Sequence, residues 1–286
     1  MTEIPLEYRE AVNTYEPVVM EGIKLYPIRV REYEAYGNAR PALDFLQQSL
    51  PVRYLSMPLL SAFYAMDVEN QKEGRPSDGL FLRALLFLVL ALRHRTDLDM
   101  DERLRDLFRG VYTSAEDPTV LVEIRFEQDG KEHSITPVQF QLMRPVLAAQ
   151  NGIKLYSTDA NPELVETERK LAELNGPELD YDIHGLIASL ATLTQAEERE
   201  IYDWPILKLN RRREALERVL QYLLCGISTA QGAQFKGGNP VPSPFFDRAK
   251  RDNGTLIDMG AVTGGRSVTV SKETPTQFQQ TNNIKE

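Results

Sequence analysis

The sequence contains a single cysteine, Cys225, among its 286 residues. One cysteine excludes an internal disulfide and cannot build a zinc site made of thiolates. The first residues, MTEIPLEYREAV, lack the charged-then-apolar order of a secretory signal peptide. We therefore expect the protein to work in the reducing environment of a cytoplasm.

Basic residues are fewer than acidic ones: 33 lysines and arginines against 42 aspartates and glutamates give a net charge of −9. Proteins that bind nucleic acids usually carry a basic stripe, so this balance argues against a nucleic-acid partner. The one tight basic cluster is Arg211–Arg213. Three consecutive helical residues spread over about 200° of the helix surface, which favours a solvated face over a phosphate site.

Motifs for catalysis and metal binding are missing as well. No Gly-x-Ser-x-Gly, Walker A or Gly-x-Gly-x-x-Gly pattern occurs, and no two of the three histidines have metal-ligand spacing (His94, His133, His184). Asp97 opens a run like an EF-hand loop, but Glu102 stands where the loop needs glycine and Phe108 where it needs glutamate. The sequence predicts a protein that is not an enzyme and has no cofactor or metal, although a site assembled from scattered residues would escape a motif search.

Long apolar runs are limited to one, Leu80–Leu92, in which Arg83 is the single polar residue. Its thirteen residues would span about 20 Å as a helix, too short for about 30 Å of bilayer hydrocarbon. We therefore expect a helix enclosed by the rest of the chain and no membrane partner. Ser77 or Asp78 would cap its start, and Arg93–Arg95 would lie in its last turn.

Two β-hairpins are predicted, one near residues 17–27 and one near 120–135. Glu21-Gly22 separates two short apolar runs, and Asp129-Gly130 separates an alternating strand from its return strand. Thr136 and Gln139 then form a capping box for a helix that ends at Asn151-Gly152. This stretch is a compact hairpin-helix module.

Helical spacing recurs in most of the remaining chain, and we find no internal repeat, heptad run or low-complexity tract. The expected helices are 30–50 with a break at Pro41, 54–66 with Pro58 in its first turn, 97–108, 159–175, 182–193 and the amphipathic 207–224, with a surface loop at 67–78. The predicted fold is mainly α within the α+β class, built around the central helix at about 80–92. We divide it into residues 1–117, 118–156, 157–240 and an extension at 241–286.

Three segments, taken in order, resemble those of a known family. The first is the hairpin-helix module from Val120 to Ile153, the second is Asp203–Asn210 (DWPILKLN) before a long amphipathic helix, and the third is the GAQFKG turn at Gly232–Gly237. Together with a Leu-Tyr-Pro-Ile start at Leu25–Ile28, they resemble tail assembly chaperone-like proteins of bacteriophages and prophages of Gram-positive bacteria. The resemblance covers most of residues 20–240.

This resemblance implies a non-enzymatic protein that binds the long, apolar tape measure protein of a phage tail while the tube assembles around it. The tail tube protein is a second implied partner, and self-association stays open. The alternative is a structural virion component, such as a baseplate or connector subunit. A structural subunit would remain in purified particles, whereas a chaperone would be absent from them.

An apolar client needs an exposed apolar surface on its chaperone. We assign part of this partner-binding surface to Phe235, Phe245 and Phe246, because a segment rich in glycine and proline offers aromatic side chains little regular structure in which to be buried. The alternative is that these side chains pack the last segment onto the core.

The tail from Arg266 to Glu286 is rich in Ser, Thr, Gln and Asn and is predicted to be disordered. Removing it should leave the melting temperature nearly unchanged, as measured by circular dichroism on the full and truncated chains. A loss of several degrees would mean that the tail is packed.

Overall fold

The computed structural model describes residues 4–76, 79–156, 161–175, 182–232, 235, 239–246, 256–257 and 269–270. Contacts divide the chain into two units, Met1–Glu214 and Ala215–Glu286, which are described separately. The domain boundaries expected from the sequence stay predictions. The caps expected at Ser77 and Asp78 lie outside the described residues.

The described residues form ten α-helices and seven short strands, which confirms the predicted mainly α, α+β class. The α-helices are α1 (Leu6–Thr14), α2 (Tyr33–Leu43), α3 (Leu59–Lys72), α4 (Leu80–Ala91), α5 (Met100–Leu107), α6 (Pro137–Gln150), α7 (Pro162–Asn175), α8 (Ile183–Thr194), α9 (Glu198–Tyr202) and α10 (Ile206–Ala230). The strands are β1 (Val18–Met20), β2 (Ile23–Leu25), β3 (Phe108–Thr113), β4 (Leu121–Gln128), β5 (Lys131–Ile135), β6 (Leu256–Ile257) and β7 (Thr269–Val270).

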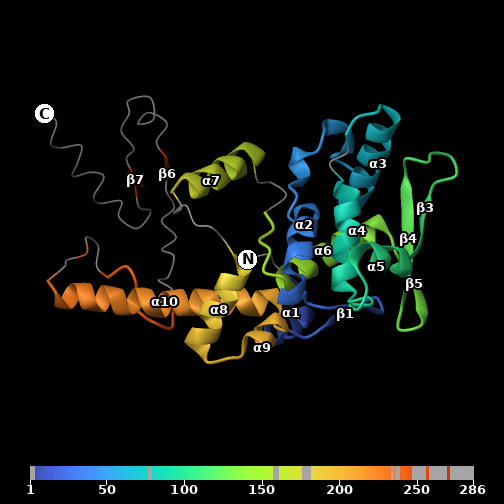
Figure 1. Cartoon of the computed structure of the whole chain (residues 1–286). Coiled ribbons are helices and arrows are strands. Elements are labelled where there is room, and N and C mark those ends of the chain that lie inside the picture. The colour runs from blue at the N-terminus through green and yellow to red at the C-terminus, as the bar shows by residue number, and fades with distance from the viewer. Residues whose placement is uncertain are drawn as a thin grey trace, which may run out of the picture. The chain divides into compact units, whose positions relative to one another are not determined.

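The first unit is built around α4, as the sequence predicted. Figure 1 shows α4 with α2, α3, α5 and α6 around it, and its residues Phe87–Ala91 are all buried. The main apolar cluster continues from α4 into Phe63 of α3 and Phe126 of β4. Fully burying side chains of this size contributes about 1.5–3 kcal/mol each. The apolar run therefore becomes the centre of the core.

The end of α4 differs from the prediction. The helix stops at Ala91, so Arg93–Arg95 follow it and do not form its last turn. Arg93 has φ 52° and Arg95 has φ 38°, both in the left-handed region that glycine usually occupies. The N–H of Arg93 donates to the carbonyl of Leu90, which closes the helix at this point.

The hairpin-helix module is confirmed in detail. β4 and β5 pair antiparallel across the turn at Asp129-Gly130, and the Thr136 hydroxyl and the Gln139 side chain form both bonds of the capping box, at 3.2 and 2.8 Å. Gly152 has φ 70°, as a left-handed helix stop requires. The hairpin of β1 and β2 near residues 17–27 is confirmed as well.

The second sheet has a third strand that the sequence analysis missed. β3 pairs antiparallel with β4, so the predicted two-stranded hairpin is the inner part of the order β3-β4-β5. The residues of β3 alternate only weakly between half-buried and exposed, and the register of its pairing with β4 shifts near Gly110. A half-exposed edge strand of this kind is formed by pairing and leaves a weak pattern in the sequence.

Two predicted helices have different limits in the structure. The segment expected to be helical up to Pro51 stops at Leu43, because the half-buried Arg144 of α6 donates to the carbonyls of Leu43 and Phe45. Burial lowers the pKa of Arg144 to about 10, so it is still protonated at neutral pH. The helix expected at 54–66 is α3, which begins after Pro58 and runs to Lys72, through half of the loop expected at 67–78. The ring of Pro58 disfavours helical backbone at the preceding residue, Met57, so α3 starts only after Pro58.

In the second unit, β6 and β7 pair antiparallel. Residues Thr269–Val270 of β7 fall inside the tail predicted to be disordered. The rest of that tail lies outside the described residues.

Asn151 joins three parts of the first unit. Its side-chain oxygen accepts from the N–H of Ile28 at 2.9 Å, its amide donates to the carbonyl of Leu147 at 2.8 Å, and its own carbonyl accepts from the hydroxyl of Tyr36. Because Asn151 is fully buried, no water can replace these partners.

Substituting Asn151→Ala should therefore lower the free energy of unfolding by about 2 kcal/mol, since the N–H of Ile28 is left buried without its acceptor. Urea unfolding followed by tryptophan fluorescence would measure it. The control is Asn38→Ala in α2, where the side chain is exposed and little change is expected. Equal losses for both variants would contradict this role of Asn151.

Candidate functional site

The beginning of α10 is anchored in the first unit. Ile206 and Leu209 are buried, and the N–H of Ile206 donates to the carbonyl of Ile28 at 2.9 Å. The cation of Lys208 lies 4.5 Å from the ring of Trp204, and Arg211 lies over the ring of Tyr15. These contacts fix the first turns of the helix, and Arg211 belongs to the basic cluster that the sequence predicted as a solvated face.

The C-terminal half of α10 is exposed. None of its residues from Ala215 to Ala230 is buried, although the sequence continues to place leucines three and four positions apart. We define the α10 stripe as six apolar residues at that spacing: Leu216, Val219, Leu220, Leu223, Leu224 and Ile227. They cover about 140° of the helix surface. Leu223 is 53%, Leu224 62% and Ile227 56% exposed.

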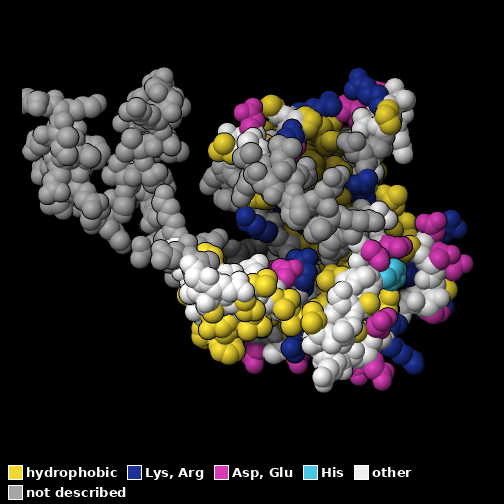
Figure 2. Space-filling model, turned by 60° about the vertical axis from the view of Figure 1, so that its left-hand side comes forward, with side chains coloured by type: hydrophobic (Ala, Val, Ile, Leu, Met, Phe, Trp, Pro, Cys, Tyr) yellow, Lys and Arg dark blue, Asp and Glu magenta, His cyan; other side chains and the backbone are white. Residues whose placement is uncertain are grey.

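An exposed face of this kind differs from scattered apolar residues. Figure 2 shows hydrophobic side chains gathered next to one another on part of the surface, and α10 carries six of the large apolar residues that are exposed (Val219, Leu220, Tyr222, Leu223, Leu224, Ile227). Contiguous exposed apolar surface usually marks a site where another molecule binds.

The sequence analysis found part of this face. It placed Leu216, Leu220 and Leu223 near one side of a helix expected to end at 224, whereas α10 continues to Ala230. It also found no heptad run. Yet Leu209, Arg213, Leu216, Leu220, Leu223, Ile227 and Ala230 follow one another at alternating spacings of four and three. Arg213 interrupts this series, which leaves four consecutive large apolar residues, fewer than a sustained heptad run requires.

The predicted partner-binding phenylalanines lie in the second unit. Phe245 and Phe246 are 76% and 73% exposed and lie edge to face, with ring centroids 6.4 Å apart, whereas Phe235 is half-buried. The carbonyl of Phe245 accepts from Arg218 at 3.4 Å. Arg218 lies about 180° around α10 from the stripe, so this contact is on the other side of the helix. A role for the three phenylalanines in partner binding stays a prediction.

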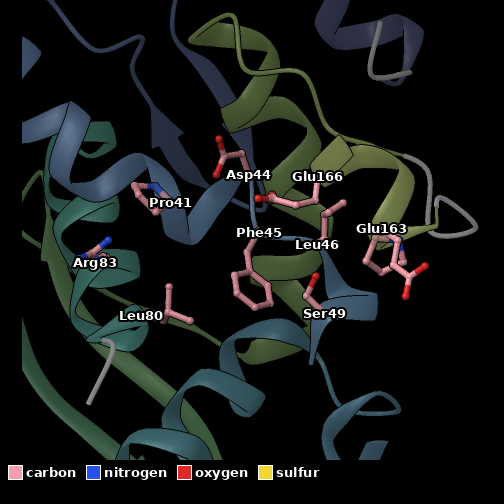
Figure 3. A pocket seen from close by; sticks show the side chains of 10 residues that line it. Pro41, Asp44, Phe45, Leu46, Ser49, Leu80, Arg83, Glu163 and Glu166 are labelled. Atoms are coloured by element: carbon pink, nitrogen blue, oxygen red, sulfur yellow. The ribbon is translucent and has the colours of Figure 1, made fainter. Parts of the chain in front are cut away.

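An open pocket of about 630 Å³ lies in the first unit between the end of α2, the start of α4 and α7. In Figure 3, Phe45 and Leu80 point into it, and Glu163 and Glu166 extend from α7. Its described lining includes Ser49 and the carboxylates of Asp44, Glu163 and Glu166, but no histidine, cysteine or lysine.

One histidine pairs with a carboxylate: the Nε2 atom of His94 and the Oδ2 atom of Asp106 are 2.7 Å apart. The hydrogen bond from His94 lowers the pKa of the Asp106 carboxyl. A cleft of about 430 Å³ beside this pair is lined also by Arg95, Arg109 and Glu127, with no serine, threonine or cysteine among the described lining residues. The pair therefore lacks a nucleophile to activate, and we interpret it as a bond that holds the turn after α4.

A buried ion pair supports the same turn. The Nη1 atom of Arg103 lies 2.8 Å from Glu32, and its Nε donates to the carbonyl of His94 at 2.6 Å. Arg103 and Glu32 are only 4% and 11% exposed at their side chains. Removing one partner of such a pair leaves a buried charge uncompensated, which is strongly destabilising. These groups hold the chain between α4 and α5 in place.

Within the described ranges, no cluster of three or more histidine, cysteine, aspartate or glutamate side chains could hold a metal ion. None of the described helices is both long and apolar enough to cross a membrane. The α10 stripe is thus the surface feature of the described chain that most clearly suggests binding.

The two halves of α10 offer a matched test. Leu209→Ala should lower the free energy of unfolding by about 3 kcal/mol, because it empties a fully buried site, whereas Leu223→Ala should change it by less than about 0.5 kcal/mol. Both values come from urea unfolding at low protein concentration. A large loss for Leu223→Ala in dilute solution would show that the stripe is covered within one chain.

No family model matches the chain, and neither a curated protein nor a solved structure does.

Proposed function

We propose that this protein is a tail assembly chaperone of a phage or prophage, and that it binds the tape measure protein in the host cytoplasm without catalysing a reaction. The observation that carries the proposal is the α10 stripe, an apolar face exposed along the second half of a 25-residue helix. Compatible with it is the net charge of −9.

The chemistry of the client explains why such a face would be useful. A tape measure protein, as the resemblance implies it, presents long apolar helical stretches that would aggregate before the tube encloses them. An amphipathic helix binds another helix through side chains at spacings of three and four, which is the spacing of the α10 stripe. Binding would remove apolar surface of both partners from water.

The test is co-expression of the full chain with the tape measure protein encoded near it, followed by affinity purification. Wild type should yield a soluble complex. The double substitution Leu220→Asp with Leu223→Asp should reduce the recovered client at least tenfold, because two carboxylates would be desolvated in the contact.

The matched control is Gln221→Asp, which adds a carboxylate on the same helix but outside the stripe. It should bind the client as wild type does, and all variants should keep the wild-type circular dichroism spectrum. Failure of folded wild type to bind the folded client would refute the proposal. The pair Phe245→Ala and Phe246→Ala tests separately whether the exposed phenylalanines contribute.

Mass spectrometry of purified particles separates this function from the alternative of a structural virion component. A chaperone should be absent from the mature particle. Stoichiometric presence of this chain would favour the structural role, in which the α10 stripe would be a permanent interface.

A further inference from the structure

The pocket between α2, α4 and α7 carries opposite charges on its two sides. In Figure 3, Arg83 of α4 lies on one side and Glu163 and Glu166 of α7 lie on the other, with Phe45 and Leu80 between them. The three charged side chains are exposed, and Arg83 forms no ion pair with either glutamate. The pocket therefore has a cationic end, an apolar middle and an anionic end.

The apolar middle is held in place by the core. The ring of Phe45 packs edge to face on Phe63 of α3, with centroids 5.2 Å apart, and its carbonyl accepts from Arg144 of α6. Leu80 is only 7% exposed, because it begins the central helix. A floor that is already ordered loses little conformational freedom when a ligand covers it.

The charges at both ends are available to a ligand. Among the residues that the structure describes, neither the guanidinium of Arg83 nor the carboxylate of Glu163 has a hydrogen bond or an ion pair. Glu166 pairs with Lys170 one turn further along α7 at 3.5 Å, but both side chains are more than half exposed, and such pairs are weak. The third carboxylate, Asp44, pairs with Arg40 at 3.2 Å, and no ligand contact is assigned to it.

We propose that this pocket binds a molecule in which an aliphatic chain joins a carboxylate to an ammonium group, as in 6-aminohexanoate or the C-terminal lysine of a peptide. The carboxylate accepts from Arg83, whose planar guanidinium can donate two parallel hydrogen bonds. The ammonium donates to Glu163 and Glu166, and the methylene groups cover Phe45 and Leu80. The site lies in the first unit and does not involve the α10 stripe, so it is independent of the proposed function.

Three probes of equal chain length test the need for both charges. Ligand-observed NMR titrations of the full chain compare 6-aminohexanoate, hexanoate and hexylamine. The first should bind with a dissociation constant on the order of 1 mM. The other two should bind about fivefold more weakly, since each loses one exposed ion pair. Hexylamine that binds as tightly as 6-aminohexanoate, or 6-aminohexanoate that shows no saturable binding, would overturn the proposal.

Substitutions test the two ends separately. Arg83→Gln should weaken 6-aminohexanoate about fivefold without weakening hexylamine, and the double substitution Glu163→Gln with Glu166→Gln should weaken 6-aminohexanoate without weakening hexanoate. The matched control is Glu198→Gln in α9, an exposed carboxylate outside the pocket, which should bind all probes as wild type does. All variants should keep the wild-type circular dichroism spectrum. An equal loss for the control would mean that the net charge of the chain attracts the probe, which would refute the site.

Two peptides distinguish the sources of such a ligand. Gly-Gly-Lys with a free C-terminal carboxylate is compared with its C-terminal amide. Binding of the free peptide alone would assign the pocket to C-terminal lysines, and binding of 6-aminohexanoate without either peptide would assign it to a free amino acid. An amide that binds as tightly as the free peptide would contradict the role of Arg83 and overturn the proposal.

Discussion

The fold of the first unit depends on how one extended segment, residues 24–30, satisfies its backbone hydrogen bonds. Beyond its pairing with β1 and a β-bridge from Arg29 to Pro205, its N–H and carbonyl groups bind to distant parts of the chain. The partners are the side chains of Gln128, Gln150 and Asn151 and the backbones of Ala91, Trp204 and Ile206. Buried backbone groups must find such partners. The segment therefore joins α4, the hairpin-helix module and the start of α10.

Where the pattern is local, the sequence was sufficient to predict the structure. The central helix follows from one apolar run, and the hairpin-helix module follows from a period-two strand, an Asp-Gly turn and a capping box, all of which act over a few residues. The failures depend on distant residues. The end of α2 is set by Arg144, which is 101 positions from Leu43, and β3 is set by its pairing with β4.

In the candidate site, too, one part is predictable from local sequence and another depends on distant residues. Leucines at spacings of three and four can be seen in the sequence, but whether such a face is covered cannot, because coverage depends on the rest of the fold. Leu209 and Leu223 occupy the same side of α10, yet the first is fully buried and the second is half exposed. A sequence pattern identifies an apolar stripe, and only the structure separates the part that packs from the part that can bind.

The hydrogen bonds of residues 24–30 also affect the order in which the chain can fold during synthesis. The N–H of Ile28 donates to the side chain of Asn151, 123 residues further on, and its carbonyl accepts from the N–H of Ile206. Contacts of such large sequence separation slow folding, because a long loop must close first. The hydrogen bonds within the hairpin-helix module join residues close in the sequence, whereas the N-terminal segment cannot complete its contacts until most of the chain has been made.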